Sequence, residues 1–291
     1  PAARRASWRA AFWIDGAESL TYLSLLPQHR VPDLDLAIAG IAGRMGQALV
    51  NAAAGGDFVV AGGSELPGSA HVGREIGAGV VISDSAAKAA ANADVWIDFT
   101  TPVATLAALE LLNNTKVKAA IVGTTGLSAT QEQQIAEHAR RIAIVRAGNF
   151  SVGVNLLLGL VEQAAARLGP DWDIEISETH HRRKVDAPSG TALMMGEAAA
   201  RGRDVKLTDM RMPPHDGLTG PRKAGAIGFA VSRGGGVIGD HEVRFVSDEE
   251  ILSIGHRALD RAIFAKGALH AAGWAAGQNP GLYSMRDVLA L

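Results

Sequence analysis

The chain has 291 residues, with 28 Lys and Arg against 30 Asp and Glu, and a formal net charge of −2. This length predicts about two domains, each with its own core, and the charge argues against a general nucleic-acid or membrane-surface role. The absence of cysteine excludes disulfides, thiolate catalysis, iron–sulfur clusters and cysteine zinc sites, and it is typical of a reducing compartment such as the cytoplasm. No apolar run approaches the ~18 residues that a membrane span needs.

The first 33 residues differ in composition from the rest. Arg4, Arg5 and Arg9 all precede the first acidic residue, Asp15. We expect a disordered N-terminal extension over 1–33 with no folded role; a transit peptide is the alternative, since such peptides are rich in Arg and poor in acids.

A glycine turn follows the first predicted strand, Leu34–Ala39. Its sequence is Gly40-Ile41-Ala42-Gly43-Arg44-Met45-Gly46, and a helix is predicted directly after it, over 47–54. Strand, glycine turn and helix together indicate dinucleotide binding: Gly40 for the tight turn, Gly43 for the approach of a pyrophosphate, and Gly46 for close helix packing. Ala42 replaces the middle glycine of the usual motif, and a turn that binds nothing is the alternative.

The end of the second predicted strand, 58–61, indicates which dinucleotide binds. Glu65 stands about where an acidic residue meets the adenosine ribose hydroxyls. Its neighbour is Leu66, not an arginine, and a carboxylate would repel a 2′-phosphate. Arg44 and Arg74 are cations within possible reach, so the pattern favours NADH and leaves NADPH open.

Strands and helices alternate through the remainder of the first half. Strands are predicted at 80–83, 95–99, 119–122 and 142–145, and helices at 84–93, 104–113 and 128–140. This alternation predicts a parallel sheet covered on both faces, with its ligand at the carboxyl ends of the strands. The loops expected to line the cofactor site are therefore 100–102, 123–126 and 147–153.

The second half has a different pattern. A helix over 154–168 precedes alternating strands at 174–179, 228–232 and 241–246. Because Gly234–Gly236 joins the last two strands, we predict that they are adjacent and antiparallel. The loop 209–223 is long enough to be a lid, a binding loop or an oligomer contact. A final Ala-rich helix over 258–276 is expected to pack back on the first half.

The most informative stretch runs from Glu178 to Ala192. It holds His180, His181 and Lys184, followed by Pro-Ser189-Gly-Thr and a predicted helix over 192–200. A Ser N-cap and the free N–H groups of a first helical turn bind anions, and the imidazoles and ammonium are possible proton donors. Neighbouring residues of a strand face opposite ways, so the two histidines should have separate roles, and no metal site is predicted. A solvated basic strand end before an ordinary helix is the alternative.

Five motifs occur in the order seen in the 4-hydroxy-tetrahydrodipicolinate reductase (dihydrodipicolinate reductase) family. The chain resembles that family in the glycine loop, 97–102, 123–126, 149–155 and His180-His-x-x-Lys-x-Asp-Ala-Pro-Ser-Gly-Thr191. The resemblance implies an α/β fold: a Rossmann-type doubly wound parallel sheet plus an α+β substrate and oligomerisation domain with a mixed sheet. It implies a dinucleotide-binding domain over 34–151, completed by 262–291, a substrate-binding and tetramerisation domain over 152–261, and a homotetramer.

The resemblance also implies roles for individual residues. It implies His180 and Lys184 as catalytic residues, and His181, Ser189, Gly190 and Thr191 as the residues that hold a small dicarboxylate substrate. It further implies that NADH or NADPH is contacted by Gly40, Ile41, Ala42, Gly43, Arg44, Met45, Glu65, Gly123, Thr124, Thr125, Ala147, Gly148, Asn149 and Phe150. Leu66 and Thr101 stand where some members carry arginine.

The implied activity is the NAD(P)H-dependent reduction of 4-hydroxy-tetrahydrodipicolinate with loss of water, in diaminopimelate and lysine biosynthesis. Another NAD-dependent oxidoreductase acting on a small dicarboxylate is an alternative, although a semialdehyde dehydrogenase needs a cysteine nucleophile. A non-catalytic dinucleotide sensor is the second alternative, and it would have no need of the His180 and Lys184 cluster.

Overall fold

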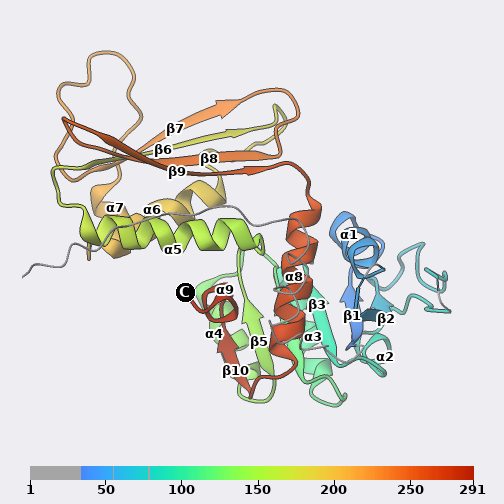
Figure 1. The fold of residues 1–291 in the computed structure, drawn as a ribbon. Helices are drawn as coiled ribbons and strands as arrows, with labels where there is room; N and C mark the ends of the chain where they lie inside the picture. Colours follow the sequence, from blue (N-terminus) through green and yellow to red (C-terminus); the bar gives the residue numbers. More distant parts are fainter. Residues whose placement is uncertain (1–33, 55, 78) are drawn as a thin grey trace, which may run out of the picture. The chain divides into compact units, whose positions relative to one another are not determined.

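The computed structural model describes residues 34–54, 56–77 and 79–291, so the extension expected over 1–33 lies outside the described residues. Six strands form the first sheet in the order β10-β5-β4-β3-β1-β2, and all neighbours are parallel. The strands are β1 (Leu34–Ala39), β2 (Phe58–Ser64), β3 (Val95–Asp98), β4 (Ala119–Val122), β5 (Ala143–Arg146) and β10 (Gly281–Tyr283). The predicted Rossmann-type sheet is therefore confirmed (Figure 1).

Helices cover both faces of this sheet because its strands are apolar on both sides. Leu36 and Ile38 belong to one core cluster, while their chain neighbours Ala37 and Ala39 belong to another, since successive side chains of a strand point to opposite faces. The first cluster includes residues of α1 (Arg44–Ala53), α8 (Ala262–Ala275) and α9 (Met285–Leu289). The second includes residues of α2 (Ala86–Ala89), α3 (Pro102–Leu112) and α4 (Ala129–His138).

Parts of the first sheet and of the segments around it differ from the prediction. Residues 80–83 form no strand but only isolated bridges, from Ser83 to Ser64 and from Val81 to Glu75. The apolar run was misleading because Val81 is 56% exposed and its segment folds back on its own loop. The helix predicted over 84–93 is reduced to the four residues of α2, and β10 and α9 were not predicted.

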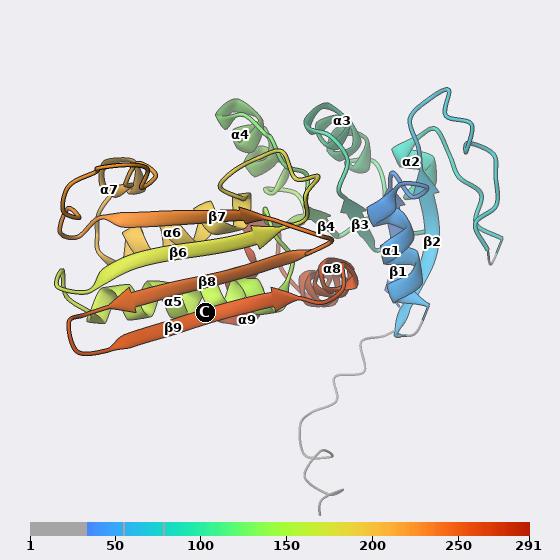
Figure 2. The same ribbon diagram turned by 90° about the horizontal axis from the view of Figure 1, so that it is seen from above.

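The second sheet is mixed and has the order β7-β6-β8-β9 (Figure 2). Its strands are β6 (Asp173–His180), β7 (Ile227–Arg233), β8 (Gly239–Val246) and β9 (Ile251–Ala258). β7 runs parallel to β6, and both other pairs are antiparallel.

The prediction that the strands now called β7 and β8 are adjacent and antiparallel is wrong, because β6 lies between them. Their glycine-rich connection crosses the end of β6, where Gly234 N–H donates to His180 O at 2.9 Å and Arg182 N–H donates to Gly235 O at 3.3 Å. β9 was not predicted at all, and the helix expected to begin at residue 258 begins at Ala262.

One face of the second sheet packs on α5 (Val152–Arg167) and α6 (Gly190–Gly202), as Figure 1 shows, and α7 (Leu207–Met210) follows α6. The buried cross-strand pairs on this face change character along β6. Ile174 lies opposite Phe245 and Ile176 opposite Val243, but Glu178 lies opposite His241. The core is therefore apolar at one end of the sheet and polar at the carboxyl end of β6.

Candidate functional site

The glycine turn has the geometry expected of it. Gly40 adopts a φ of +60°, and Gly43 N–H donates to Gly40 O at 2.9 Å. A Cβ at Gly46 would lie 2.5 Å from both Gly40 O and Ile41 Cα, so only glycine allows α1 to begin this close to β1.

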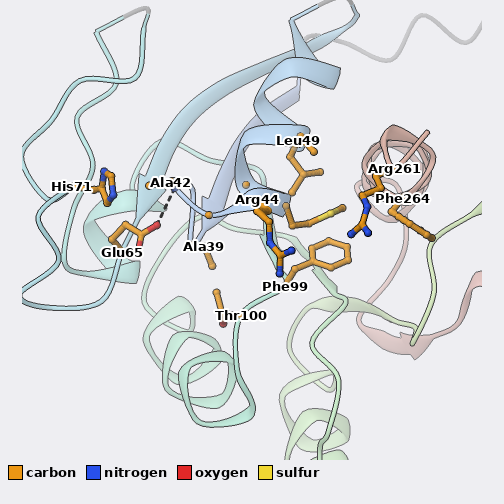
Figure 3. A pocket seen from close by; sticks show the side chains of 15 residues that line it. Ala39, Ala42, Arg44, Leu49, Glu65, His71, Phe99, Thr100, Arg261 and Phe264 are labelled. Atoms are coloured by element: carbon orange, nitrogen blue, oxygen red, sulfur yellow. Dashed lines mark hydrogen bonds between the residues drawn. The ribbon is translucent and has the colours of Figure 1, made fainter. Parts of the chain in front are cut away.

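A cavity of about 630 Å³ opens in front of this turn (Figure 3). Six predicted cofactor residues line it: Gly40, Ala42, Gly43, Arg44, Met45 and Glu65. Ile41 does not, because its side chain is fully buried in the core. The volume suits a small-molecule ligand.

Among the lining residues that were not predicted as site residues, His71, Phe99, Arg261 and Phe264 have aromatic or charged side chains. Arg261 and Phe264 belong to the start of α8, far from the glycine loop in sequence. No local motif marks either residue, and only the packing of α8 against α1 brings them to the cavity. Figure 3 shows the Arg44 side chain directed toward Phe99 and away from Glu65.

Glu65 is fixed at the end of β2. Its Oε1 accepts a hydrogen bond of 2.9 Å from Ala42 N–H, which ties the residue to the glycine turn (Figure 3). A second, mostly apolar cavity of about 340 Å³ adjoins it, lined among others by Leu66, Trp96 and Leu111. Glu65 thus lies between the two cavities.

Asp98 fixes two of the loops predicted to line the cofactor site, a role that the sequence reasoning missed. The residue is fully buried, and its Oδ1 accepts hydrogen bonds from Thr100 N–H at 2.9 Å and Thr100 Oγ1–H at 2.6 Å. Thr124 also donates to it at 3.3 Å and bonds Thr105 at 2.7 Å. Thr100 lines the larger cavity, whereas Gly123, Thr124 and Thr125 do not.

The loop after β5 connects the predicted cofactor residues with the predicted substrate residues. Ala147, Gly148, Asn149 and Phe150 do not line the larger cavity, and Phe150 is buried with its ring edge-on to Phe99 at a centroid distance of 5.3 Å. Asn149 Nδ2 donates to Thr191 Oγ1 at 3.1 Å. A predicted cofactor residue therefore contacts a predicted substrate residue.

The N-terminus of α6 has the predicted cap. Ser189 Oγ accepts from Ala192 N–H at 3.1 Å and contacts His241 Nε2 at the same distance, so this buried hydroxyl is used within the protein. Within the described residues, the N–H groups of Gly190 and Thr191 have no hydrogen-bond partner, and a Cβ at Gly190 would meet nothing within 4 Å. The first turn of α6 can therefore receive an anion.

The two histidines have different surroundings, as expected. His180 is buried, and its Nδ1 lies 2.6 Å from Glu178 Oε2. His181 is half-buried just beyond the strand, and partial desolvation together with nearby cations, Arg183 first, holds the pKa of His181 below its ordinary value. Lys184 Nζ lies 2.9 Å from Asp186 Oδ1, and this hydrogen bond lowers the pKa of Asp186.

The buried carboxylate of Glu178 is ionised. Burial raises its pKa, but hydrogen bonds from Arg233, His180 and Ser189 N–H outweigh that effect, and the net pKa of Glu178 lies below its ordinary value. Burial also lowers the pKa of His241 to about 4, and the proximity of His180 adds to that shift. His241 is therefore neutral near pH 7.

Comparison with known proteins identifies the family of this chain. A family model described as dihydrodipicolinate reductase, N-terminus, matches residues 34–150, and one described as dihydrodipicolinate reductase, C-terminus, matches 153–289. The chain belongs to the dihydrodipicolinate reductase family.

Individual members of the family are similar over most of this chain. 4-Hydroxy-tetrahydrodipicolinate reductase of Caulobacter vibrioides is 51% identical over 256 residues, covering 87% of this chain and 96% of that protein. The protein of the same name from Brucella abortus is 48% identical, covering 89% and 99%. The dipicolinate-bound dihydrodipicolinate reductase of Paenisporosarcina sp. TG-14 has the same fold, with a TM-score of 0.71 at 23% identity over 87% of this chain and 97% of that one.

The described residues contain no candidate for two other kinds of site. In the described ranges, no group of three or more His, Cys, Asp or Glu side chains is arranged to hold a metal ion. No helix within those ranges combines the length and apolarity of a membrane span.

Proposed function

We infer that this protein catalyses the NAD(P)H-dependent reduction of 4-hydroxy-tetrahydrodipicolinate to tetrahydrodipicolinate with loss of water, a step of diaminopimelate and lysine biosynthesis. Family membership across both halves of the chain supports this activity. The Asn149–Thr191 hydrogen bond is the structural observation that supports this activity most directly. It connects the start of α6, where an anion can bind, to a loop of the parallel sheet.

The glycine turn and its cavity fit a nicotinamide dinucleotide. The exposed backbone at Gly43 and the first turn of α1 offer N–H groups to a pyrophosphate, and Glu65 offers its Oε2 to a ribose hydroxyl. We propose Gly40–Met45, Glu65, 123–125 and 147–150 as the cofactor residues, with Phe99, Arg261 and Phe264 added from the cavity. When bound, the dinucleotide supplies a hydride.

On the substrate side, the N–H groups of Gly190 and Thr191 bind one carboxylate, and His181 contributes to the same subsite. The Ser189 hydroxyl acts indirectly, by capping the helix that presents these groups. The substrate first loses water, the hydroxyl from one carbon and a proton from the neighbouring carbon next to the imine, which leaves a double bond conjugated with the imine. A hydride then adds to the far carbon of that double bond, and the resulting enamine takes a proton at the carbon next to the imine. We propose that Lys184 donates this proton and that His180 acts as acid and base.

We propose NADH as the preferred cofactor. Glu65 is held against Ala42 and repels a 2′-phosphate, and its neighbour Leu66 is exposed and uncharged. Arg44 points toward Phe99, away from the ribose side (Figure 3).

We further propose that residues 34–151 and 262–291 form the cofactor domain and 152–261 the substrate domain. In support, every strand of the first sheet lies in the former ranges and every strand of the second in the latter. A homotetramer is proposed through the second sheet, whose apolar side chains Val231, Ile251 and Leu252 are 39%, 61% and 41% exposed. Light scattering measures the molar mass of the protein in solution. We expect the mass of a tetramer for the wild type and a lower mass for Leu252→Glu.

The activity is tested by generating the substrate in place. Pyruvate, aspartate semialdehyde and the synthase that condenses them are mixed with the protein, and oxidation of NADH or NADPH is followed by absorbance. Oxidation that requires the synthase supports the proposal, and the ratio of kcat/KM values decides the cofactor. No oxidation by a protein that still binds NADH would refute it.

The proton donor is tested by Lys184→Ala. This variant should lower kcat by about 10²-fold or more, the usual contribution of a general acid, and should leave NADH affinity unchanged. Lys223→Ala, in the 209–223 loop, is the matched control. A Lys184 variant with normal turnover and weak NADH binding would show that the assignment is wrong.

A further inference from the structure

Glu178 occupies the centre of the polar end of the second sheet. Its side chain is 1% exposed and accepts four hydrogen bonds. They come from His180 Nδ1 at 2.6 Å, Ser189 N–H at 2.9 Å, and Arg233 Nη1–H and Nη2–H at 2.8 and 2.9 Å. Both carboxylate oxygens are thus fully used, and the Arg233 contact has the bidentate geometry of a strong ion pair.

Each of these donors belongs to a different part of the proposed reductase site. His180 is the proposed acid and base, and Ser189 begins the helix whose N-terminus receives the substrate carboxylate. Arg233 also donates to Asp186 O at 2.7 Å, and the Asp186 carboxylate pairs with Lys184. The buried carboxylate of Glu178 therefore links His180 to the start of α6. Through Arg233 and Asp186 it is also linked to Lys184.

We propose that Glu178, held by Arg233, is a positioning residue of the reductase site that fixes the tautomer and orientation of His180 together with the start of α6. The proposal rests on the proposed function, because it takes His180 and α6 as parts of the working site. Glu178 does not reach the cavity, so it acts through the residues that it holds.

The tautomer follows from the chemistry of the pair. An ionised carboxylate only accepts hydrogen bonds, so Nδ1 of His180 carries its proton, and Nε2 is the nitrogen left to exchange one with a substrate. The ring is also confined on its other side: a Cβ built on Gly239 would lie 3.1 Å from His180 Nε2 and 3.3 Å from His241 Cε1. The imidazole is thus held between Glu178, His241 and the backbone of β8.

A purely structural ion pair is the competing explanation, since removing one partner of a buried pair destabilises a protein in any location. The two explanations differ in kinetics. A structural role changes the amount of folded enzyme and leaves kcat per folded site unchanged. A positioning role lowers kcat in enzyme that is fully folded.

Glu178→Gln keeps the shape of the side chain and removes its charge. We expect kcat per active site to fall by about 10- to 100-fold, within the range that general acid–base groups contribute, while the dissociation constant for NADH changes less than about twofold. Glu162→Gln is the matched control, because Glu162 also pairs with two arginines, Arg201 and Arg286, outside the site. A folded Glu178→Gln enzyme with the kcat of the Glu162→Gln control would overturn the proposal.

A second measurement needs no activity. In protein labelled with ¹⁵N-histidine, assigned with a His180→Asn variant, NMR should show the neutral His180 ring protonated on Nδ1, with a proton that exchanges slowly with solvent. A ring protonated on Nε2 would overturn the proposal even if the enzyme turns over. Failure of the wild-type coupled assay, with the Nδ1 tautomer observed, would instead refute the proposed function and leave the Glu178–His180 geometry standing.

Discussion

His241 makes the stability of this protein dependent on pH. Burial, supported by the proximity of His180, lowers its pKa from 6.5 to about 4, and Glu178 and Asp240 oppose this shift only in part. Its side chain packs edge-on against His180, and His256 faces it from the neighbouring strand β9. At ~1.4 kcal/mol per pKa unit, a shift of about 2.5 units corresponds to roughly 3 kcal/mol between the two protonation states.

The direction of this pH dependence follows from which state of the chain, folded or unfolded, binds the proton. Between pH 6.5 and 4 the imidazole takes up a proton in the unfolded chain but not in the folded one, so stability falls as the pH falls. The contribution is complete above about pH 6.5 and is lost as the pH approaches 4. For these two pKa values, linkage gives a loss of about 2 kcal/mol in the free energy of unfolding between pH 7 and pH 5.

Urea unfolding of the full chain at pH 7 and pH 5 measures this loss. His241→Gln retains an amide that can donate to Ser189 Oγ but cannot titrate, so it should reduce the difference between the two pH values by about 2 kcal/mol. His181 and His256, whose pKa values are also lowered by desolvation, should keep their own contributions. His270→Gln, at an exposed position of α8, is the matched control and should retain the difference. The reasoning is refuted if His241→Gln loses as much stability on acidification as the wild type, or if NMR titration of His241 gives a pKa near 6.5.

Three further predictions concern the cofactor site. Leu66→Arg places a guanidinium beside the ribose and should raise the ratio of kcat/KM for NADPH to that for NADH by about tenfold, the value of one hydrogen bond to a charged group. Leu66→Gln is the control and should leave this ratio unchanged. An unchanged ratio in Leu66→Arg would show that the 2′-phosphate lies elsewhere. Gly46→Ala should cost roughly 1–3 kcal/mol in urea unfolding and weaken NADH binding, because its Cβ would overlap backbone atoms. Gly273→Ala is its control, since a Cβ there makes only an ordinary 3.7 Å contact with Phe58. Arg261→Met should raise the KM for NADH by about tenfold if its guanidinium contacts the bound dinucleotide, whereas Lys266→Met on the exposed side of α8 should not.

The first sheet could be predicted well because its signals are local. The glycine turn and the apolar strands each lie within a few residues, and Gly40 and Gly46 occupy the positions that their roles require. The segment 80–83 misled the prediction, since an apolar run also occurs in an exposed loop that bonds to itself. Arg261 could not be found in this way, because only the packing of a distant helix brings it to the cavity.

The surroundings of His180 depend on the order of the strands, and the local sequence pattern does not predict that order. The glycine-rich connection between β7 and β8 indicated that they were neighbours, which would leave Glu178 without one of its two flanking strands. In the observed order, β6 lies between them, so Arg233 of β7 and His241 of β8 approach the end of β6 from opposite sides. Arg233 is thereby able to bind Glu178, and His241 to pack against His180.

This strand order links stability to the proposed chemistry. A carboxylate buried at the end of a sheet requires a cation and hydrogen-bond donors, and Arg233, His180 and Ser189 N–H provide them. The same burial keeps His241 neutral, so it contacts Ser189 without adding a charge beside the start of α6. Because the folded protein keeps His241 neutral until the pH approaches 4, we expect acidification below pH 6.5 to lower the free energy of unfolding while the support that His241 gives to α6 and His180 stays intact.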